Sequence, residues 1–265
     1  LIFFPIPSKE EQKAIAKALS DTDELITTLE KLISKKEAIK QGTMQQLLTG
    51  KKRLSGFTGE WEEKSLEEVV ENAGLVRGPF GGALKKEFFV SKGYKVYEQR
   101  NAIYKSIEIG SYYIDEEKFQ ELKRFELSEG DLIVSCSGTI GKIYEIPKNA
   151  PKGIINQALL KIKLDNKKID TNFFLYIFSS NDFQSKIIDN SHGGAMPNLV
   201  GMDTFKKTII HIPKLKEQQA IAGILSDMNK EIDTLKQKLS KTKAIKDGIM
   251  SELLTGKTRL KVKDE

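Results

Sequence analysis

A segment of about 49 residues occurs twice in this sequence, and this repeat limits the possible folds more than any other feature. Residues 6–54 and 212–260 align without a gap, and about 27 of the aligned positions are identical. Each copy contains the pattern Glu-Gln-x-Ala-Ile-Ala and ends in Leu-Leu-Thr-Gly-Lys. A long segment duplicated on both sides of a unique one indicates a symmetric scaffold that presents the residues between the copies.

Both copies carry the seven-residue repeat of a coiled-coil helix, with apolar side chains at alternating steps of three and four. Each runs about 38 residues before Gly50 or Gly256, which gives roughly 57 Å at 1.5 Å per residue. Since a helix this long needs a partner, we expect the two to pair as an antiparallel coiled coil, in one chain or between two. The expected pairing residues are Ile15, Leu19, Ile26, Leu29, Ile33, Ile221, Leu225, Met228, Ile232, Leu235 and Leu239.

The first copy has a broader apolar stripe than the second. Ala18, Leu25, Leu32 and Ile39 add a second row beside the pairing residues. A stripe wider than a coiled-coil seam indicates contact with more than one partner helix.

The repeat also proposes the domain boundaries of an α+β protein. We expect spacer helices at 8–54 and 213–265, on either side of one mixed α/β domain at 55–212. Residues 1–7 align with the end of that domain, so we expect them to be the terminal strand of a preceding, absent copy of it. Expected elements within the domain are helices at 66–74, 115–125 and 171–188 and strands at 94–98, 107–114, 131–135, 143–146, 154–164 and 208–213.

Several loops of the middle segment combine glycine with side chains that bind nucleic acid. Arg77, Lys85 and Lys86 flank a glycine-rich loop at 78–82, which could bring cations and backbone N–H groups to phosphate; turn formation alone would also explain the glycines. Gln, Arg and Asn can form paired hydrogen bonds with base edges. The expected DNA-contacting residues are Arg77, Lys85, Lys86, Gln99, Arg100, Asn101, Tyr104, Lys105, Ser137, Thr139, Lys142, Asn156, Gln157, His192 and Asn198.

Each of these assignments has a structural alternative. Gln99, Arg100 and Asn101 could be solvated polar residues at a strand end. Asn156 and Gln157 interrupt an apolar run, so they belong either to a hydrogen-bonded core network or to a surface-facing pair.

Charge and chemistry narrow the function. The formal charge of +6 favours a polyanionic partner. The single cysteine, Cys136, excludes an intramolecular disulfide and fits a reducing cytoplasm, and no run is long and apolar enough for a membrane helix. Two histidines and one cysteine cannot form an ordinary zinc site. Nucleotide-binding and methyltransferase motifs are also missing, so we expect binding without catalysis, cofactor or metal.

These residues together carry a family resemblance: the chain resembles the DNA-specificity subunit of type I restriction-modification enzymes. The segments that carry it are 130–135, 138–142, 156–159, 198–199, 212–222 and 253–256. The resemblance implies an α/β target-recognition domain followed by a long helix, a pair that the full subunit repeats. It also implies that two such domains recognise the halves of a split DNA sequence while the helices set their spacing and bind methyltransferase subunits.

The sequence departs from that pattern in holding one recognition domain between two helices. The leading hypothesis is a non-catalytic specificity subunit, or its C-terminal portion, that recognises one half-site of double-stranded DNA. Its expected partners are methyltransferase subunits, restriction subunits reached through them, and a second copy or second half-subunit, without a membrane. The alternative is a structural coiled-coil adaptor whose middle domain binds protein.

Overall fold

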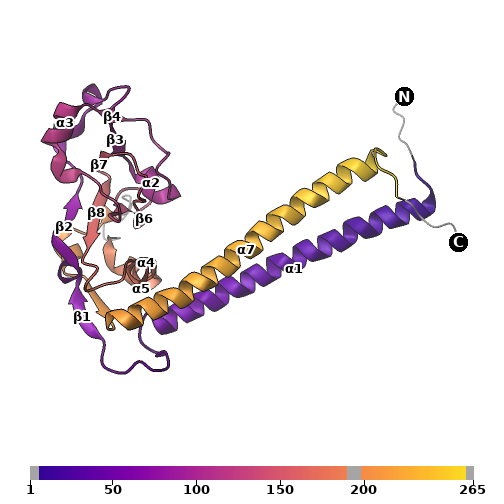
Figure 1. Cartoon of the computed structure of the whole chain (residues 1–265), viewed down its shortest axis with the longest axis horizontal. Coiled ribbons are helices and arrows are strands. Elements are labelled where there is room, and N and C mark those ends of the chain that lie inside the picture. Colours follow the sequence, from indigo (N-terminus) through magenta and orange to yellow (C-terminus); the bar gives the residue numbers. More distant parts are fainter. Residues whose placement is uncertain (1–5, 190–197, 261–265) are drawn as a thin grey trace. The chain divides into compact units, whose positions relative to one another are not determined.

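The computed structural model describes residues 6–189 and 198–260, and the chain divides into two compact units (Figure 1). One unit, the arms, consists of residues Leu1–Met44 and Gly223–Glu265; the other, the domain, consists of Gln45–Ala222. The domain is wider than the expected 55–212 because the last residues of the first helix and the first residues of the second pack within it. Leu47, Leu48 and Ile221 are buried there. The expected strand at 1–7 falls almost entirely outside the described residues.

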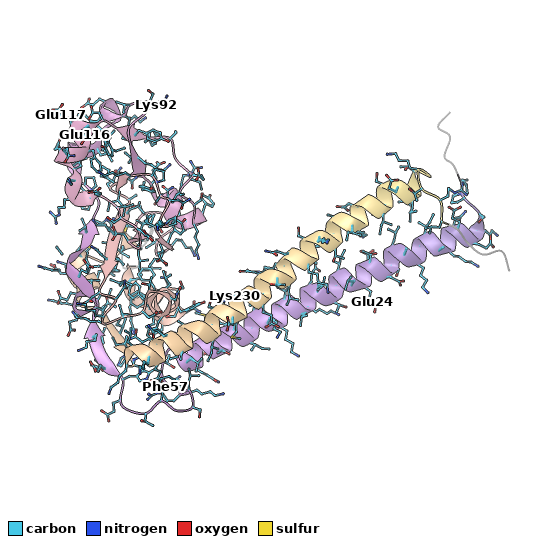
Figure 2. All side chains as sticks on the ribbon, viewed as in Figure 1. Glu24, Phe57, Lys92, Glu116, Glu117 and Lys230 are labelled. Carbon is cyan, nitrogen blue, oxygen red and sulfur yellow. The ribbon has the colours of Figure 1, made fainter. Side chains whose placement is uncertain are left out.

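The two long helices, α1 (Lys9–Leu47) and α7 (Leu215–Leu254), run side by side as an antiparallel pair (Figure 1). Leu29, Ile33 and Ile232 are at most 7% exposed, whereas charged residues such as Glu24 and Lys230 cover the outer faces (Figure 2). The expected α+β class with paired arms is therefore confirmed. The remaining pairing residues of the arms are buried or half-buried: Ile15, Leu19, Ile26, Leu225, Met228, Leu235 and Leu239. Ile221 lies in the domain, so its pairing role stays a prediction.

The polar contacts between the arms repeat about a pseudo-two-fold axis. Glu30 pairs with Lys243 over 2.7 Å, and the residues that the repeat aligns with these two, Lys236 and Glu37, pair over 2.6 Å. In the same way, the 2.6 Å ion pair between Asp23 and Lys246 has its counterpart in the 2.8 Å hydrogen bond from Lys40 to Asn229. The sequence repeat is thus also a repeat of contacts.

Two further clusters follow the same symmetry, one in each unit. In the N-terminal cluster, formed by Glu11, Gln12 and Arg259, the Glu11 carboxylate accepts from the Arg259 guanidinium. In the domain cluster, formed by Glu217, Gln218 and Arg53, the Glu217 carboxylate accepts two bonds of 2.7 Å from Arg53. Each long helix therefore has, in its first turn, a glutamate that binds an arginine located after the end of the other long helix.

The domain is built on small sheets. One has four antiparallel strands in the order β2-β8-β5-β6, and another has three in the order β4-β3-β7, with β3 and β7 parallel; β1 pairs with β11 and β9 with β10. The strands are β1 (Glu62–Ser65), β2 (Val70–Arg77), β3 (Tyr94–Tyr97), β4 (Tyr113–Ile114), β5 (Leu132–Ser135), β6 (Ile143–Glu145), β7 (Gly153–Ile155), β8 (Leu159–Leu164), β9 (Ile188–Asp189), β10 (Asn198–Leu199) and β11 (Ile209–Ile212).

Short helices connect the strands, and polar side chains start several of them. Asp115, Asp170 and Ser180 each accept a main-chain N–H at the start of α3, α4 and α5. The helices are η1 (Leu66–Glu68), η2 (Gly81–Leu84), η3 (Lys86–Phe88), α2 (Gln99–Tyr104), α3 (Glu116–Glu121), η4 (Lys123–Phe125), α4 (Thr171–Phe178), α5 (Asn181–Ile187) and α6 (Met202–Lys206).

Five expected elements were wrong in extent. The helix at 115–125 ends at Glu121 and is followed by the separate short helix η4. The helix at 66–74 stops after one turn, η1, and continues as β2, because Leu75 to Arg77 pair with β8. The strand at 107–114 shortens to β4, and the helix at 171–188 breaks before Ser180, which caps α5. The strand at 154–164 is two strands in different sheets, β7 and β8. Asn156 separates them because its side-chain oxygen accepts the Ala158 N–H over 3.0 Å and turns the chain.

Candidate nucleic-acid interface

The turn at 156–158 is where the strands that carry candidate residues meet. The Asn156 N–H donates to the carbonyl of Tyr97, the last residue of β3. The Ala158 carbonyl accepts from the N–H of the cysteine that directly follows β5. Gly78, directly after β2, donates to the Leu159 carbonyl at the start of β8; each of these bonds is 2.9 Å. The ends of β2, β3, β5 and β7 therefore lie together. The candidates brought to this junction are Arg77, Gln99, Ser137, Asn156 and Gln157.

A hairpin tip extends the junction. The Ser135 hydroxyl donates to the Thr139 carbonyl over 2.6 Å and accepts from the Lys142 N–H over 3.0 Å, which fixes the tip between β5 and β6. Thr139 and Lys142 are exposed on it. Asn198 joins the tip because it forms an isolated β-bridge with Ser137. His192 lies outside the described residues.

Helix α2 presents three candidates to solvent. Arg100, Tyr104 and Lys105 are exposed, and Lys105 ends the helix in the left-handed conformation with φ of 51°. The expected strand end at 99–101 is thus the first turn of a helix, which contacts β5 and β6.

The structure corrects the expected role of Asn101 as a DNA-contacting residue. It is 0% exposed, and its side-chain oxygen accepts the Glu98 N–H over 2.7 Å while its amide donates to the carbonyls of Ser106 and Ile109, each over 2.8 Å. Because these bonds use its donor and acceptor groups inside the protein, Asn101 holds the loop after α2 and is not free to contact a base.

Lys85 and Lys86 stay on the surface at the short helices η2 and η3, after the glycine-rich loop. The glycine at 78 has a packing reason, since a Cβ atom there would lie 1.8 Å from the Asn156 carbonyl oxygen. The loop between Gly78 and Lys85 is therefore fixed against the junction at its base.

Two polar atoms at the junction are buried without a hydrogen-bond partner in the described part of the chain: Arg77 Nε and Gln99 Oε1. Cys136 lies beside the Arg77 guanidinium; burial raises the pKa of its thiol to about 12, although Arg77 opposes the shift. A thiol with so high a pKa is protonated near neutral pH and is a poor nucleophile.

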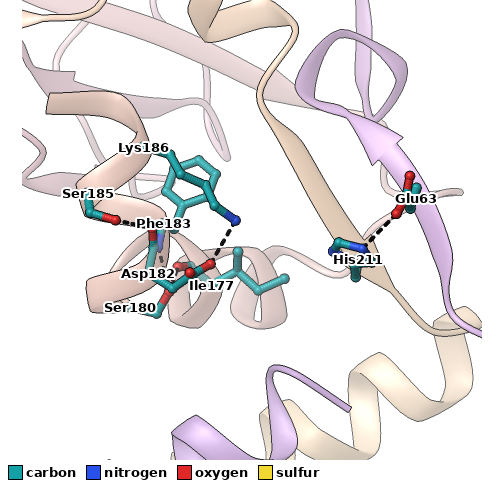
Figure 3. Close-up of polar contacts among 8 residues, drawn as sticks. All are labelled: Glu63, Ile177, Ser180, Asp182, Phe183, Ser185, Lys186 and His211. Atoms are coloured by element: carbon teal, nitrogen blue, oxygen red, sulfur yellow. Dashed lines mark hydrogen bonds and ion pairs between the residues drawn. The ribbon is translucent and has the colours of Figure 1, made fainter. Parts of the chain in front are cut away.

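A groove at α5, α6 and β11 adds little positive charge to this surface. It is lined by Lys186, Lys207 and His211 among others. Lys186 is paired with Asp182 over 2.8 Å and His211 contacts Glu63 over 3.0 Å (Figure 3). Because carboxylates already contact two of these three basic side chains, the groove is not part of the candidate interface.

The residues 6–189 and 198–260 contain no group of three or more His, Cys, Asp or Glu side chains placed to hold a metal ion. Over the same residues, no helix is long and apolar enough to cross a membrane. What the junction offers is a surface of cations, amides and hydroxyls, which can donate hydrogen bonds to phosphates and base edges.

Comparison with known proteins decides the family. Residues 58–244, more than half of the chain, match the model of the type I restriction modification DNA specificity domain. This chain belongs to that family. A type I restriction enzyme specificity subunit of Methanocaldococcus jannaschii, MjaVIII, is 29% identical over 98% of this specificity-domain chain.

Solved structures share the fold of this specificity-domain chain. The HsdS subunit from Thermoanaerobacter tengcongensis aligns with a TM-score of 0.64 at 14% identity, over 96% of this chain and 61% of that one. The S subunit from M. genitalium aligns with a TM-score of 0.55 at 17% identity, over 93% and 61%. The chain spans 63% of the length of the M. jannaschii relative, so it corresponds to about three fifths of such a subunit.

Proposed function

We propose that this chain is a non-catalytic DNA sequence-specificity subunit, or part of one, of a cytoplasmic type I restriction-modification complex. In this proposal the domain recognises one half of a split target, and the arms dock methyltransferase subunits, which connect it to restriction subunits. The observation that carries the proposal is the junction: side chains suited to bases and phosphates, far apart in sequence, gather on one surface of a specificity-domain chain.

The proposed DNA-contacting set keeps the expected residues apart from Asn101. Those most accessible are Arg100, Tyr104, Lys105, Thr139, Lys142, Gln157 and Asn198. Lys85 and Lys86 would contact phosphate beside them, and the half-buried Arg77, Gln99, Ser137 and Asn156 would support or join them. His192 stays a prediction.

The arms support docking because part of their apolar surface has no cover among the residues that the structure describes. Leu25, Leu32 and Ile39 are 42%, 37% and 46% exposed, and they recur every seven residues on α1. A stripe with this spacing fits another helix packing against the pair. We propose methyltransferase helices as its partner.

The exposure of Ile6, near the N-terminal cluster, supports the proposal of a second recognition domain. Ile6 is 82% exposed, whereas the aligned Ile212 is 5% exposed in β11. We propose that another domain of the same kind, from a second copy or a second half-subunit, covers this region. Two domains on arms about 58 Å long would span roughly one and a half turns of DNA, which suits two half-sites with unread base pairs between them.

The test is reconstitution with the cognate methyltransferase. We expect co-elution on size exclusion and tighter binding of the complex to a duplex with the target sequence than to a scrambled duplex. Absence of both would refute the proposal. Weak binding without sequence preference, together with a steep dependence on salt, would favour the protein-binding adaptor instead.

A single substitution sharpens the test. Arg100→Ala should weaken binding to the target by about 1–3 kcal/mol and relax the choice at one position if Arg100 contacts guanine. Arg124→Ala, which removes another exposed arginine outside the proposed set, is the matched control. Equal weakening on target and scrambled DNA would make Arg100 a phosphate contact.

A further inference from the structure

Phe80 is the most exposed large apolar side chain of the described part of the domain. It is 67% exposed, at the tip of the glycine-rich loop that follows β2. The sequence predicted phosphate contacts for the glycines and cations of this loop and no role for the aromatic residue between them. A single exposed apolar residue is ordinary on a protein surface, so exposure alone does not indicate binding. The residues around Phe80 do.

The loop holds Phe80 on a rigid base. Gly78 packs so closely on Asn156 that no side chain fits between them, and its N–H bonds to Leu159 over 2.9 Å. Pro79 is buried and its ring fixes the backbone angle φ. Phe80 therefore follows a two-residue anchor, which restricts where its main chain can lie.

The ring is also supported by a cation. The Arg77 guanidinium lies 5.8 Å from the centroid of the Phe80 ring, within the range of a cation–π contact. Arg77 itself is half-buried at the end of β2. Most of the ring remains in solvent, so a large apolar surface is held in place where water is its main contact.

We propose that Phe80 packs against the nucleobases of the bound duplex. The inference rests on the proposed function. The surroundings favour DNA: Lys85 and Lys86 flank the loop, and the exposed Gln157 lies in the turn against which the loop is anchored. A phenyl ring has no hydrogen-bond donor for phosphate, and the bases offer it the planar faces and methyl groups of DNA.

Two base surfaces are apolar enough to receive the ring. One is the C5-methyl group of thymine, which lies on the major-groove edge. The other is the face of a base at a partly unstacked step, into which proteins insert Phe as a wedge. Both are apolar contacts with a base, and both would add to the hydrogen bonds of the neighbouring candidates.

The experiment compares Phe80→Ala and Phe80→Leu with the unchanged chain, each in complex with the cognate methyltransferase, on target and scrambled duplexes at several salt concentrations. We expect Phe80→Ala to weaken target binding about tenfold, with little change on the scrambled duplex and an unchanged salt slope. Phe80→Leu should retain most of the affinity. Circular dichroism and the thermal midpoint should stay as in the unchanged chain because the ring is exposed.

The double variant Lys85→Ala/Lys86→Ala is the matched control. It should weaken binding to both duplexes and lower the salt slope by about two. The inference would be overturned if Phe80→Ala bound the target as tightly as the unchanged chain does. It would also be overturned if the substitution weakened binding to the target and scrambled duplexes equally. If the unchanged chain neither forms the complex with the methyltransferase nor gives it a preference for the target, the proposed function fails and the inference with it. A preference that survives intact in Phe80→Ala overturns the inference alone.

Modified bases separate the two contacts. Replacing the target thymines by uracil, one at a time, removes one methyl group in each duplex. If the ring contacts a methyl group, one of these replacements should weaken DNA binding by the unchanged chain but not by Phe80→Ala. With 2-aminopurine at each step, fluorescence should rise on binding of the unchanged chain but not of Phe80→Ala if the ring enters the base stack. Neither signal at any position would overturn a base contact.

Discussion

The N-terminal cluster and the domain cluster contain aligned residues in different surroundings. Gln218 is 1% exposed, and its side chain accepts the Asp170 N–H and donates to the carbonyls of Lys168 and Pro213. Gln12 is exposed and donates to Pro7, the residue aligned with Pro213. Gln218 thus repeats the bond of Gln12 and adds two bonds to the loop before α4.

The arginines differ in the same direction. Arg53 binds Glu217, donates to the Gly59 carbonyl over 2.7 Å and lies over the Trp61 ring. Its side chain is 30% exposed, against 64% for Arg259. The repeat therefore encodes a local contact at the start of each arm, and a packed domain converts one of the two copies into a buried anchor.

The largest expected difference is between the two glutamines. Gln218→Ala should destabilise the domain by about 3 kcal/mol, because it leaves the buried carbonyl at 213 and the partly buried main-chain groups at 168 and 170 without this partner. Gln12→Ala, the matched control, should cost about 0.5 kcal/mol or less. Fluorescence of Trp61, the only tryptophan, would report unfolding of the domain in urea. Equal effects would show that the clusters do not differ in this way.

A second comparison uses the arginines. Arg53→Ala should lower the thermal midpoint more than Arg259→Ala. Both variants leave a buried glutamate without its cation, since Glu217 is 2% and Glu11 is 4% exposed, but only Arg53→Ala also removes a main-chain hydrogen bond and the contact with the Trp61 ring. Differential scanning calorimetry measures both midpoints. Arg53→Lys is a useful control, since it keeps the charge and loses the two-pronged geometry. A larger fall for Arg259→Ala would contradict the comparison.

The symmetry of the arms can be tested by charge reversal. Glu30→Lys should weaken helix pairing, and Lys243→Glu in the same chain should restore it, with a coupling energy of about 0.5 kcal/mol for an exposed pair. Glu37 and Lys236, the symmetry-related pair, should give coupling of the same sign. Thermal unfolding followed by helix ellipticity supplies the double-mutant cycles. Coupling at one pair and none at the other would break the symmetry.

The smallest expected effect is a dependence on pH at the N-terminal cluster. The hydrogen bond from Arg259 lowers the pKa of Glu11 from 4.5. Since the unfolded chain then binds more protons than the folded one at acid pH, this stabilisation is complete above 4.5 and is lost as pH falls through the lowered value. Arg259→Ala should flatten that part of a stability curve measured by helix ellipticity. An unchanged curve would contradict the role of the contact.

Local periodicity made the arms predictable from the sequence. Heptad spacing and the repeat predicted two long antiparallel helices, because helix pairing depends on residues three and four apart on the same helix. The helix that begins near Asp115 and the strands at 131–135 and 143–146 depend on equally local patterns and were also predicted. Phe80 could have been noticed from its place among glycines, since an aromatic residue in a turn has no local reason to be there.

The candidate site was predictable as a list of residues and not as an arrangement. The sequence by itself determined the residue types, the family resemblance and the class of fold. Only the tertiary structure decided that Asn101 is buried, that β7 and β8 belong to different sheets and that the Phe80 loop is anchored at Gly78. The division into two sheets and the anchoring of the Phe80 loop depend on bonds between distant segments, such as Asn156 with Tyr97 and Gly78 with Leu159. Neither hydrophobic period nor turn chemistry encodes such pairings, because they form only when whole strands pack together.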